Sequence, residues 1–395
     1  MHILLLTSEL PSATTRPGGG QLSLRWVKEL AGRHTFSLLS PVRPEEMGRL
    51  PGLKEIFAEV RTVVAEGGVG PRLARAGSLF SRPRSVAGVA SRRLRGALVE
   101  MLSSGTYDCV QLDNFPVGQY ASVLPEEMPR VLVFPDLAGE VLRQQVWLAR
   151  GLKKYYYFHQ WKLSRYWEKW YAIWSRNVFV MSLQDQRALE SWDIGVRTYI
   201  LPPLVDPRLF DLPVKNRGEG KILFFGDFSR LGVIDAAIRL KEEIMPLVRR
   251  AYPAAICQVT GNNPPERIRR LAAEDFLISG EVNRIESDLA AAALLAAPLR
   301  VAAGVGLDLV ETLAVGCPVV TTRLANAGVG ARDGREVLLA DRSEDFAAAI
   351  VRLLKSPLER ERLGQAGREW VGEKFDRSQS REQMEEVYRR IVAAG

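Results

Sequence analysis

Residues 297–322 read APLRVAAGVGLDLVETLAVGCPVVTT, and the fold can be worked outward from this stretch. A loop of small residues, 302–306, comes first. A helical pattern follows, with apolar residues at positions i, i+3, i+6 and i+7, namely Leu307, Val310, Leu313 and Ala314. The Gly-Cys-Pro sequence at 316–318 ends this helix, and 319–322 is typical of a buried strand. The stretch therefore predicts a loop, a helix and a strand of an α/β sheet.

The glycine-rich loop before this helix is a candidate anion site. Gly304, Val305, Gly306 and Leu307 stand where a helix N-terminus offers backbone N–H groups and the positive end of its dipole. Glu311 lies about one turn further on. We expect the loop to hold a diphosphate and Glu311 to accept hydrogen bonds from ribose hydroxyls. A plain glycine turn between two sheet elements would use the same residues, because a lone glycine pattern is weak evidence.

Composition limits the function classes. The chain has 395 residues, enough for two or three domains, with 47% hydrophobic and 25% charged residues, as in ordinary globular proteins. Its three cysteines are far apart in apolar runs and predict small core residues of a reducing compartment. With three histidines and no His cluster, we expect no metal site. No apolar run reaches the length of a membrane span, and the short apolar N-terminus predicts a first strand rather than a signal peptide.

The net charge of +8 is unevenly distributed. Residues 1–210 contain 27 Lys and Arg against 19 Asp and Glu, and the remainder contains 27 against 27. A basic and a neutral half predict two domains with different ligands, the basic one facing an anionic partner.

The first half begins as a βαβ unit. A strand at 3–7 is followed by a loop ending in Gly18, Gly19 and Gly20, a helix from about 21 to 32, and a strand at 36–40. The loop lacks the G-x-G-x-x-G spacing of dinucleotide sites and the Lys of a P-loop, so neither NAD nor ATP hydrolysis is inferred.

The rest of the chain continues this alternation. Further strands are expected at 60–64, 109–112, 131–134, 178–181 and 198–201, a linker near 202–220, and a second series at 222–225, 256–260, 276–279, 319–322 and 337–340. The second series should contain helices at 233–251, 286–296, 343–355, 358–374 and 377–393. The pattern is that of two doubly wound α/β domains.

Two basic stretches remain, at 72–95 and 143–176. The second combines eight basic residues with eleven aromatic ones. Basic and aromatic side chains together suit a lipid–water interface or single-stranded nucleic acid, and aromatic packing on the sheet with solvated charges would also explain them. We expect an anionic membrane or acceptor surface rather than nucleic acid, at Arg92, Arg93, Lys153, Lys154, Trp161, Lys162 and Arg165.

Several motifs occur in a family-specific order. In the second half they are ILFFG at 222–226, QVTGN at 258–262, SGEV at 279–282, PLR at 298–300, VETLAVGCPVV at 310–320 and GREVLLAD at 334–341. In the first half they are the glycines at 18–20, YD at 107–108, FPDL at 134–137, Ser182 with Asp185, and VD at 205–206 with Phe210. Over nearly its whole length the chain resembles the retaining glycosyltransferases of the glycosyl transferase group 1 family.

This resemblance implies a GT-B fold, in which two Rossmann-like doubly wound domains face a central cleft. Residues 1–210 would form the acceptor-side domain, 211–375 the donor domain, and 376–395 a helix that crosses back to the first. The donor would be a UDP- or GDP-linked sugar, with no other cofactor and no metal. Its ligands would be Gly19, Gly20, Gly226, Gly261, Val282, Gly304, Val305, Gly306, Leu307 and Glu311.

The resemblance also implies a location and an acceptor. The enzyme would be a retaining, metal-independent hexosyltransferase of the cytoplasm. If the basic and aromatic stretches bind a membrane, it would be peripheral on the inner face of that membrane. Its acceptor would be a glycan, either a lipid-linked or a polysaccharide intermediate.

The chain departs from the family pattern where charge is expected. The family has a second Glu eight residues before the position of Glu311, and this chain has Ala303; some relatives have Lys where this chain has Asp308. After the first strand of the second domain only Arg230 supplies a cation, so Arg230 is the predicted catalytic cation. Pro135 takes the place of a family His, which leaves Asp136 as the candidate for contacting the sugar or acceptor.

These departures leave alternatives open. Besides a glycosyltransferase, the sequence is compatible with a catalytically impaired binding protein of the same fold, or with a GT-B sugar-nucleotide epimerase.

Overall fold

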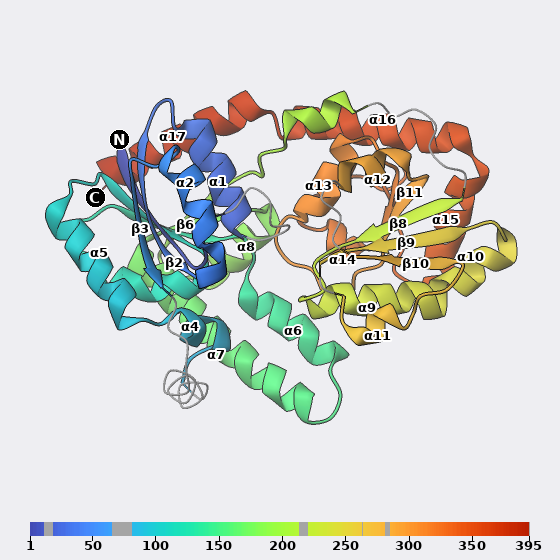
Figure 1. Ribbon diagram of the computed structural model, residues 1–395, viewed down its shortest axis with the longest axis horizontal. Coiled ribbons are helices and arrows are strands. Elements are labelled where there is room, and N and C mark those ends of the chain that lie inside the picture. Colours follow the sequence, from blue (N-terminus) through green and yellow to red (C-terminus); the bar gives the residue numbers. More distant parts are fainter. Residues whose placement is uncertain (12–18, 65–80, 213–219, 263, 281–284, 395) are drawn as a thin grey trace. The chain divides into compact units, whose positions relative to one another are not determined.

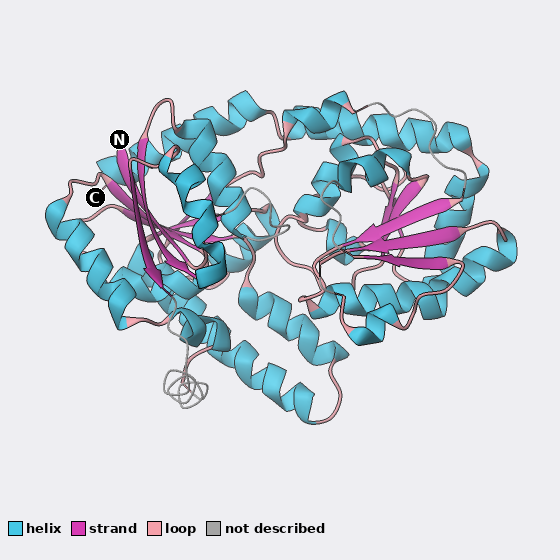
Figure 2. Ribbon diagram, viewed as in Figure 1, coloured by secondary structure: helices cyan, strands magenta, loops and turns pink. Residues whose placement is uncertain are grey.

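The computed structural model describes residues 1–11, 19–64, 81–212, 220–262, 264–280 and 285–394. The chain folds into two compact units. Unit 1 contains residues 1–204 and 378–395, and unit 2 contains residues 205–377. Each unit is a parallel sheet with helices on both faces (Figure 2). The predicted α/β class is therefore confirmed in both halves.

Unit 1 is built on a sheet of seven described strands in the order β3-β2-β1-β4-β5-β6-β7, all parallel. The strands are β1 His2–Thr7, β2 Thr35–Val42, β3 Glu59–Val64, β4 Cys109–Asp113, β5 Arg130–Phe134, β6 Asn177–Val180 and β7 Arg197–Ile200. The helices are α1 Gly19–Leu30, η1 Pro44–Arg49, α2 Leu50–Lys54, α4 Arg84–Val89, α5 Arg92–Ser104, η2 Phe115–Val123, α6 Ala138–Leu148, α7 Leu152–Ser175, α8 Leu183–Glu190 and α17 Arg377–Ala393.

The central strands of unit 1 are near-continuous apolar runs because helices cover both faces of the sheet. β4, β5 and β6 are buried at every residue. The C-terminal helix α17 packs beside α1 in this unit (Figure 1), where Arg33 bonds Glu385 at 2.8 Å and Tyr388 bonds Gln111 of β4. Residues 378–395 thus complete the core of unit 1.

Unit 2 has a sheet of six described strands in the order β10-β9-β8-β11-β12-β13, also parallel. The strands are β8 Lys221–Phe225, β9 Ile256–Thr260, β10 Phe276–Ser279, β11 Leu294–Ala297, β12 Val319–Thr321 and β13 Leu338–Leu339. The helices are η3 Pro207–Asp211, α9 Leu231–Arg239, η4 Leu240–Ile244, α10 Met245–Ala251, α11 Glu266–Arg269, α12 Ile285–Ala291, α13 Leu307–Ala314, α14 Arg323–Asn326, α15 Ser343–Lys355 and α16 Pro357–Lys374.

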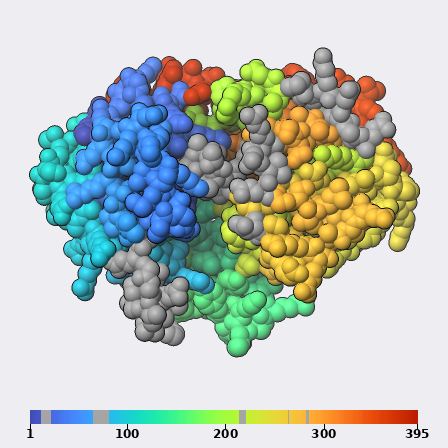
Figure 3. All heavy atoms as spheres, viewed as in Figure 1, coloured from blue at the N-terminus to red at the C-terminus, as the bar shows by residue number. Residues whose placement is uncertain are grey.

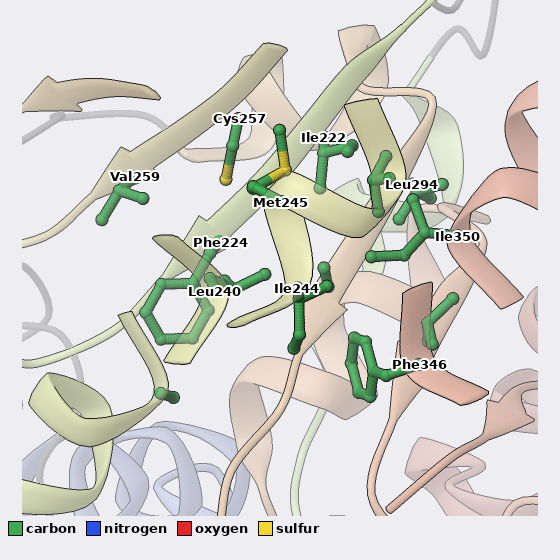
Figure 4. Close-up of a cluster of buried hydrophobic side chains, with 14 of the residues drawn as sticks. Ile222, Phe224, Leu240, Ile244, Met245, Cys257, Val259, Leu294, Phe346 and Ile350 are labelled. Carbon is green, nitrogen blue, oxygen red and sulfur yellow. The ribbon is translucent and has the colours of Figure 1, made fainter. Parts of the chain in front are cut away.

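The core of unit 2 lies between the sheet and the helices α9, α10 and α15. Figure 4 shows its centre, where Phe224 of β8, Leu240 and Ile244 of η4, and Phe346 and Ile350 of α15 converge. All five side chains are at most 1% exposed. Burial of this size stabilises the unit by roughly 1.5–3 kcal/mol for each large side chain.

One element prediction was wrong, and another was confirmed with a local irregularity. Residues 286–296 were expected to form one helix, but α12 ends at Ala291 and β11 begins at Leu294. The alanine-rich run fits a helix and a fully buried strand equally well, and the central position beside β8 makes it a strand. The helix expected at 233–251 contains a π segment, Leu240–Ile244, two residues before Pro246, whose missing N–H interrupts the regular ladder.

The boundary between the units lies at Leu204 rather than at 210. Val205 and Leu209 are buried in the same cluster as Leu309 and Leu313 of α13. Apolar burial therefore places residues 205–210 in unit 2.

Candidate functional site

The topological switch point of unit 2 lies between β8 and β11. From β8 the chain builds β9 and β10 on one side and β11, β12 and β13 on the other. The loops that follow β8 and β11 therefore leave the carboxyl edge of the sheet in opposite directions, which is where open α/β sheets bind ligands. These loops are residues 226–230 and 298–306, which carry the predicted donor residues Gly226, Gly304, Val305 and Gly306.

Glycines let the backbone segments around this edge touch. A Cβ on Gly261, after β9, would overlap the carbonyl oxygen of Gly226, after β8. A Cβ on Gly232, in the first turn of α9, would lie 2.9 Å from the carbonyl oxygen of Val301. A Cβ on Gly328, after α14, would overlap the carbonyl oxygen of Gly304. The structure thus brings Gly226, Gly261 and the 301–306 loop to one edge.

The predicted anion loop opens directly into helix α13. Gly304 has φ +69°, a conformation that favours glycine, and Gly306 is the N-cap of the helix. Leu307 is the first helical residue, and the amides of Leu309 and Val310 donate to the carbonyl oxygen of Gly306 at 2.9 and 3.1 Å. The helix ends at Ala314, with Gly316 at φ +75° and the Cys317 amide bonded to the Thr312 carbonyl at 3.1 Å.

Glu311 lies one turn into α13 and is 3% exposed. Asp308, in the first turn of the same helix, is half-buried, and its carbonyl oxygen accepts a bond from Thr312 Oγ1 at 2.6 Å. A buried carboxylate beside a helix N-terminus can accept two hydrogen bonds from vicinal hydroxyls while backbone N–H groups hold an adjacent anion.

The loop between β8 and α9 is organised by Asp227. Its carboxylate accepts bonds from the Ser229 amide at 2.9 Å and from Ser229 Oγ at 2.6 Å. Arg230 follows as the N-cap residue of α9, with an exposed side chain. The structure therefore places the predicted catalytic cation at the carboxyl edge of β8.

Arg239 is a supporting residue that the sequence reasoning missed. Its side chain is 3% exposed and donates to the carbonyls of Pro298 at 3.3 Å and Asp341 at 2.5 Å, and to Ser343 Oγ at 3.2 Å. It joins the loop after β11 to the segment after β13. Nothing in the local sequence marks it, because it is an ordinary basic residue in an amphipathic helix until the fold places carbonyls around it.

The carboxyl edge of unit 1 carries a second set of predicted residues. Its switch point lies between β1 and β4, and Gly19 and Gly20 are the first two residues of α1, which follows β1. Asp113, the last residue of β4, accepts a bond from Ser23 Oγ of α1. Burial raises the pKa of Asp113 to about 7, against the lowering effect of this bond. The sequence reasoning missed this carboxyl group because it lies at the end of an apolar strand.

Asp136 follows β5 at the same edge and is half-buried. Close by, Glu168 of α7 is 1% exposed and accepts the Gly139 amide of α6 at 2.9 Å. Burial raises the pKa of Glu168 to about 8, the Gly139 bond lowers it, and the charge of Asp136 raises it further. Asp136 and Glu168 form a carboxyl pair whose second member the sequence did not reveal.

The predicted basic and aromatic surface lies on α5 and α7. Lys153 and Lys154 are exposed in the first turn of α7, and Arg92 and Arg93 are exposed in the first turn of α5. Lys162 Nζ lies 4.8 Å from the ring centroid of Trp161, which is half-buried. The guanidinium of Arg165 lies 5.5 Å from the ring of Trp192. Within the described ranges, no helix has the length and apolar character that crossing a bilayer requires.

Comparison with known proteins finds a family match within the second unit. Residues 219–356 match the profile of the family Glycosyl transferases group 1. No curated protein sequence matches the chain.

Solved structures show the same fold over the whole chain. Sucrose-phosphate synthase from Thermosynechococcus elongatus has a TM-score of 0.75 at 18% identity and covers 100% of both chains. A TarM mutant from S. aureus, in complex with fondaparinux, α-GlcNAc-glycerol and UDP, has a TM-score of 0.74 at 11% identity and covers 98% of this chain and 99% of its own. HepE from Anabaena, in complex with UDP-glucose, has a TM-score of 0.65 at 16% identity and covers 98% of both chains. The chain therefore has the fold of these structures over its whole length.

The predicted donor-binding residues are distributed over both units. Gly226, Gly261, Gly304, Val305, Gly306, Leu307 and Glu311 all lie at or beside the carboxyl edge of the unit 2 sheet, whereas Val282 lies outside the described residues. Gly19, Gly20 and Asp136 belong to unit 1. Among the described residues, no group of three His, Cys, Asp or Glu side chains is arranged to hold a metal ion.

Proposed function

We propose that the protein is a retaining glycosyltransferase that takes a sugar from a UDP- or GDP-linked donor and transfers it to a glycan acceptor. The observation that carries this proposal is the buried Glu311 one turn into α13, directly after the 301–306 loop at the switch point of unit 2. The relatives crystallised with UDP or UDP-glucose support a nucleotide sugar as donor.

The proposed division of labour follows from the geometry of unit 2. Glu311 binds the ribose hydroxyls, and the amides that open α13 receive the diphosphate. Arg230 adds positive charge as the diphosphate leaves, and backbone donors fixed in place need no reorganisation at that moment. In this proposal no resident metal takes part.

Asp136 is proposed to contact the transferred sugar or the acceptor. It lies at the carboxyl edge of unit 1, where a carboxylate can orient a hydroxyl group. The neighbouring Glu168, with its pKa near 8, would be protonated at neutral pH and would leave Asp136 as the charged member of the pair.

The acceptor is proposed to be a lipid-linked or polysaccharide intermediate reached at an anionic membrane surface, on the cytoplasmic side. The support comes from helix α7, which exposes several apolar and aromatic side chains although some of its buried positions are polar. Its buried positions include the polar residues Gln160, Ser164, Glu168 and Ser175. Its exposed positions include Leu152 at 87%, Tyr155 at 75% and Tyr166 at 55%.

Charge adds to this pattern. Residues 141–167 contain six Lys and Arg and no Asp or Glu. Trp147, near the end of α6, is 80% exposed, and α6 packs against α7. In Figure 3 the green side chains of this segment make up much of the lower edge of unit 1. Aromatic side chains that sit at the headgroup level, flanked by cations, are typical of proteins that bind anionic bilayers.

The donor site is tested by titrating the purified protein with UDP and GDP in a calorimeter. We expect one nucleotide to bind with a stoichiometry of one per chain. Glu311→Ala should weaken nucleotide binding about 10- to 100-fold, because a hydrogen bond to a charged group contributes roughly 1.5–3 kcal/mol. The exposed Glu361→Ala in α16 serves as a control with the same charge change and should not alter binding. No binding of either nucleotide would overturn the proposal.

A second candidate is a catalytically impaired binding protein of the same fold. Two departures from the family pattern favour this candidate. The half-buried loop has the methyl group of Ala303, and the first turn of α13 has the carboxylate of Asp308. At both positions the family resemblance implies charges that would be useful to catalysis. Release of UDP or GDP from the sugar nucleotide, lost in Glu311→Ala, would exclude this candidate. Binding without release would support it.

A further inference from the structure

A cavity of about 330 Å³ lies in unit 1 between α5, η2 and α7. Its walls combine arginine and aromatic side chains, chiefly Arg82, Arg92, Arg95, Tyr120, Trp167 and Trp174. No residue of unit 2 lines it, so it is separate from the candidate donor site. The proposed sugar transfer leaves this cavity without a role.

The positive side chains at the cavity favour an anionic ligand. Arg92 and Arg95 are exposed near the start of α5, a helix with no acidic residue in its first turn. Positive side chains at a helix N-terminus add to the positive end of the dipole instead of neutralising it. Among the described residues, neither Arg82 nor Arg92 nor Arg95 forms an ion pair, and no carboxylate lines the cavity. The arrangement costs stability unless a negative ligand completes it.

The aromatic walls add an apolar surface and one unused hydroxyl group. The guanidinium of Arg82 lies 5.6 Å from the ring centroid of Trp167. Tyr171, which also lines the cavity, is fully buried, and its hydroxyl group has no hydrogen-bond partner among the described residues. A buried hydroxyl group without a partner is unfavourable, and a ligand oxygen in the cavity would satisfy it.

We propose that this cavity binds a phosphate ester whose apolar or planar body lies against Trp167 and Trp174. Arg92 and Arg95 bind the phosphate oxygens at the mouth, because planar guanidinium groups match phosphate geometry. Arg82 and the Tyr171 hydroxyl complete the site from inside. The volume suits a phosphate with a ring-sized or short-chain substituent. The ester comes either from a phospholipid headgroup or from a soluble phosphorylated compound.

Hydrogen–deuterium exchange of the full chain localises the binding and separates it from donor binding. The probes are phenyl phosphate, soluble dihexanoyl phosphatidic acid, phosphatidic acid vesicles and phosphatidylcholine vesicles. We expect phenyl phosphate or phosphatidic acid to slow exchange in 84–104 and 115–123. Protection by phenyl phosphate indicates a soluble ester, and protection by phosphatidic acid alone indicates a lipid headgroup. Either result supports the proposal, whether or not UDP protects 298–311.

The double variant Arg92→Gln/Arg95→Gln tests the assignment. This variant should weaken binding of the probe that gives protection about 10- to 100-fold, because two charge-assisted contacts are lost. The control is Arg187→Gln/Arg197→Gln, which removes the same charge from two exposed arginines of α8 and β7 and should change binding less than twofold. Tyr171→Phe should weaken binding without unfolding the protein, since the hydroxyl group has no partner among the described residues.

Three results would overturn the proposal. The first is protection confined to 298–311 with every phosphate probe. The second is an equal loss of binding in the two double variants, which would show an effect of net charge alone. The third is protection of 84–104 by an RNA hexanucleotide but by neither phenyl phosphate nor phosphatidic acid.

Discussion

At the residue scale, the donor edge of unit 2 depends on glycines that bring backbone segments into contact. Gly328 and Gly304 come from different loops, and their backbones meet only because Gly328 lacks a Cβ. Gly261 and Gly226 meet in the same way. These contacts fix the position of the loop before α13, so they bear on ligand binding as well as on stability.

Gly328→Ala should therefore weaken both folding and donor binding. The new methyl group would overlap the Gly304 carbonyl, and relieving this overlap costs about 1–3 kcal/mol. We expect a lower urea midpoint and weaker UDP or GDP binding by calorimetry. Gly372→Ala is the control. Gly372 is an exposed position of α16, where the new methyl group would lie 3.8 Å from Phe210, and the substitution should stabilise the protein by about 0.5–1 kcal/mol. Equal effects of the two variants would contradict this account.

Glu168 should make stability depend on pH. Its pKa is about 8 in the folded protein and 4.5 as the ordinary value, so the folded state keeps a proton that the unfolded state releases between these limits. Stability is then full below pH 4.5 and falls as pH rises toward 8, by up to about 1.4 kcal/mol per pH unit.

Glu168→Gln should remove this dependence, because a neutral amide can still accept the Gly139 amide bond. The measurement is the free energy of unfolding in urea, at pH 5 and at pH 8, for the variant and the natural protein. The variant should gain stability relative to the natural protein as pH rises. Asp113, with a pKa near 7, adds a dependence of the same sign between 3.8 and 7 that the variant retains. A constant difference between variant and natural protein would show that Glu168 does not titrate in this window.

At the element scale, α7 shows that a helix in the structure can contradict its own hydrophobic pattern. Sequence periodicity assigns the apolar face to the core. Here Gln160, Ser164 and Glu168 face the sheet layer, while Leu152, Tyr155 and Trp170 face solvent. Two of these side chains accept hydrogen bonds from backbone groups of other elements, Gln160 from the Arg84 amide at 2.8 Å and Glu168 from the Gly139 amide.

The exposed face of α7 should bind anionic vesicles. Leu152→Ser/Tyr155→Ser should reduce sedimentation with phosphatidylglycerol vesicles, while unfolding free energy changes by less than about 0.5 kcal/mol because both side chains are exposed. Leu358→Ser in α16, where the side chain is 80% exposed, is the matched control.

Lys153→Gln/Lys154→Gln should weaken the same binding about 30-fold at low salt, since each lysine near an anionic surface contributes about 1 kcal/mol. Raising the salt concentration should narrow this difference. Undiminished binding in both double variants, or equal binding to neutral vesicles, would rule out this surface.

At the scale of the whole molecule, the two units repeat one architecture. Each sheet is parallel and changes direction once, between β1 and β4 in unit 1 and between β8 and β11 in unit 2. Each switch point carries a glycine-containing segment and a buried carboxyl group, Asp113 in unit 1 and Glu311 in unit 2. The basic residues in excess belong to the first half of the chain, which suits an anionic surface or acceptor there.

Donor binding should stabilise unit 2 selectively. With UDP or GDP at 100 times its Kd, the stability gain is about 2.7 kcal/mol. Hydrogen–deuterium exchange of the full chain should slow in peptides covering 226–234 and 298–311. Peptides of the unit 1 core, such as 109–113 and 130–134, should keep their rates. Protection confined to unit 1 would show that the nucleotide binds elsewhere.

The sequence by itself determined the alternation of strands and helices, the helix at 307–314 with its glycine stop, and Glu311 as a carboxylate beside an anion loop. These features are local, because turn residues, caps and apolar spacing act within a few positions of the chain. Only the tertiary structure decided that 294–297 is a strand, since its pairing with β8 is non-local. The fold alone also buried Asp113 and Glu168, surrounded Arg239 with carbonyls, and exposed the aromatic face of α7. Burial and carbonyl contacts depend on segments far apart in the chain, which local spacing does not encode.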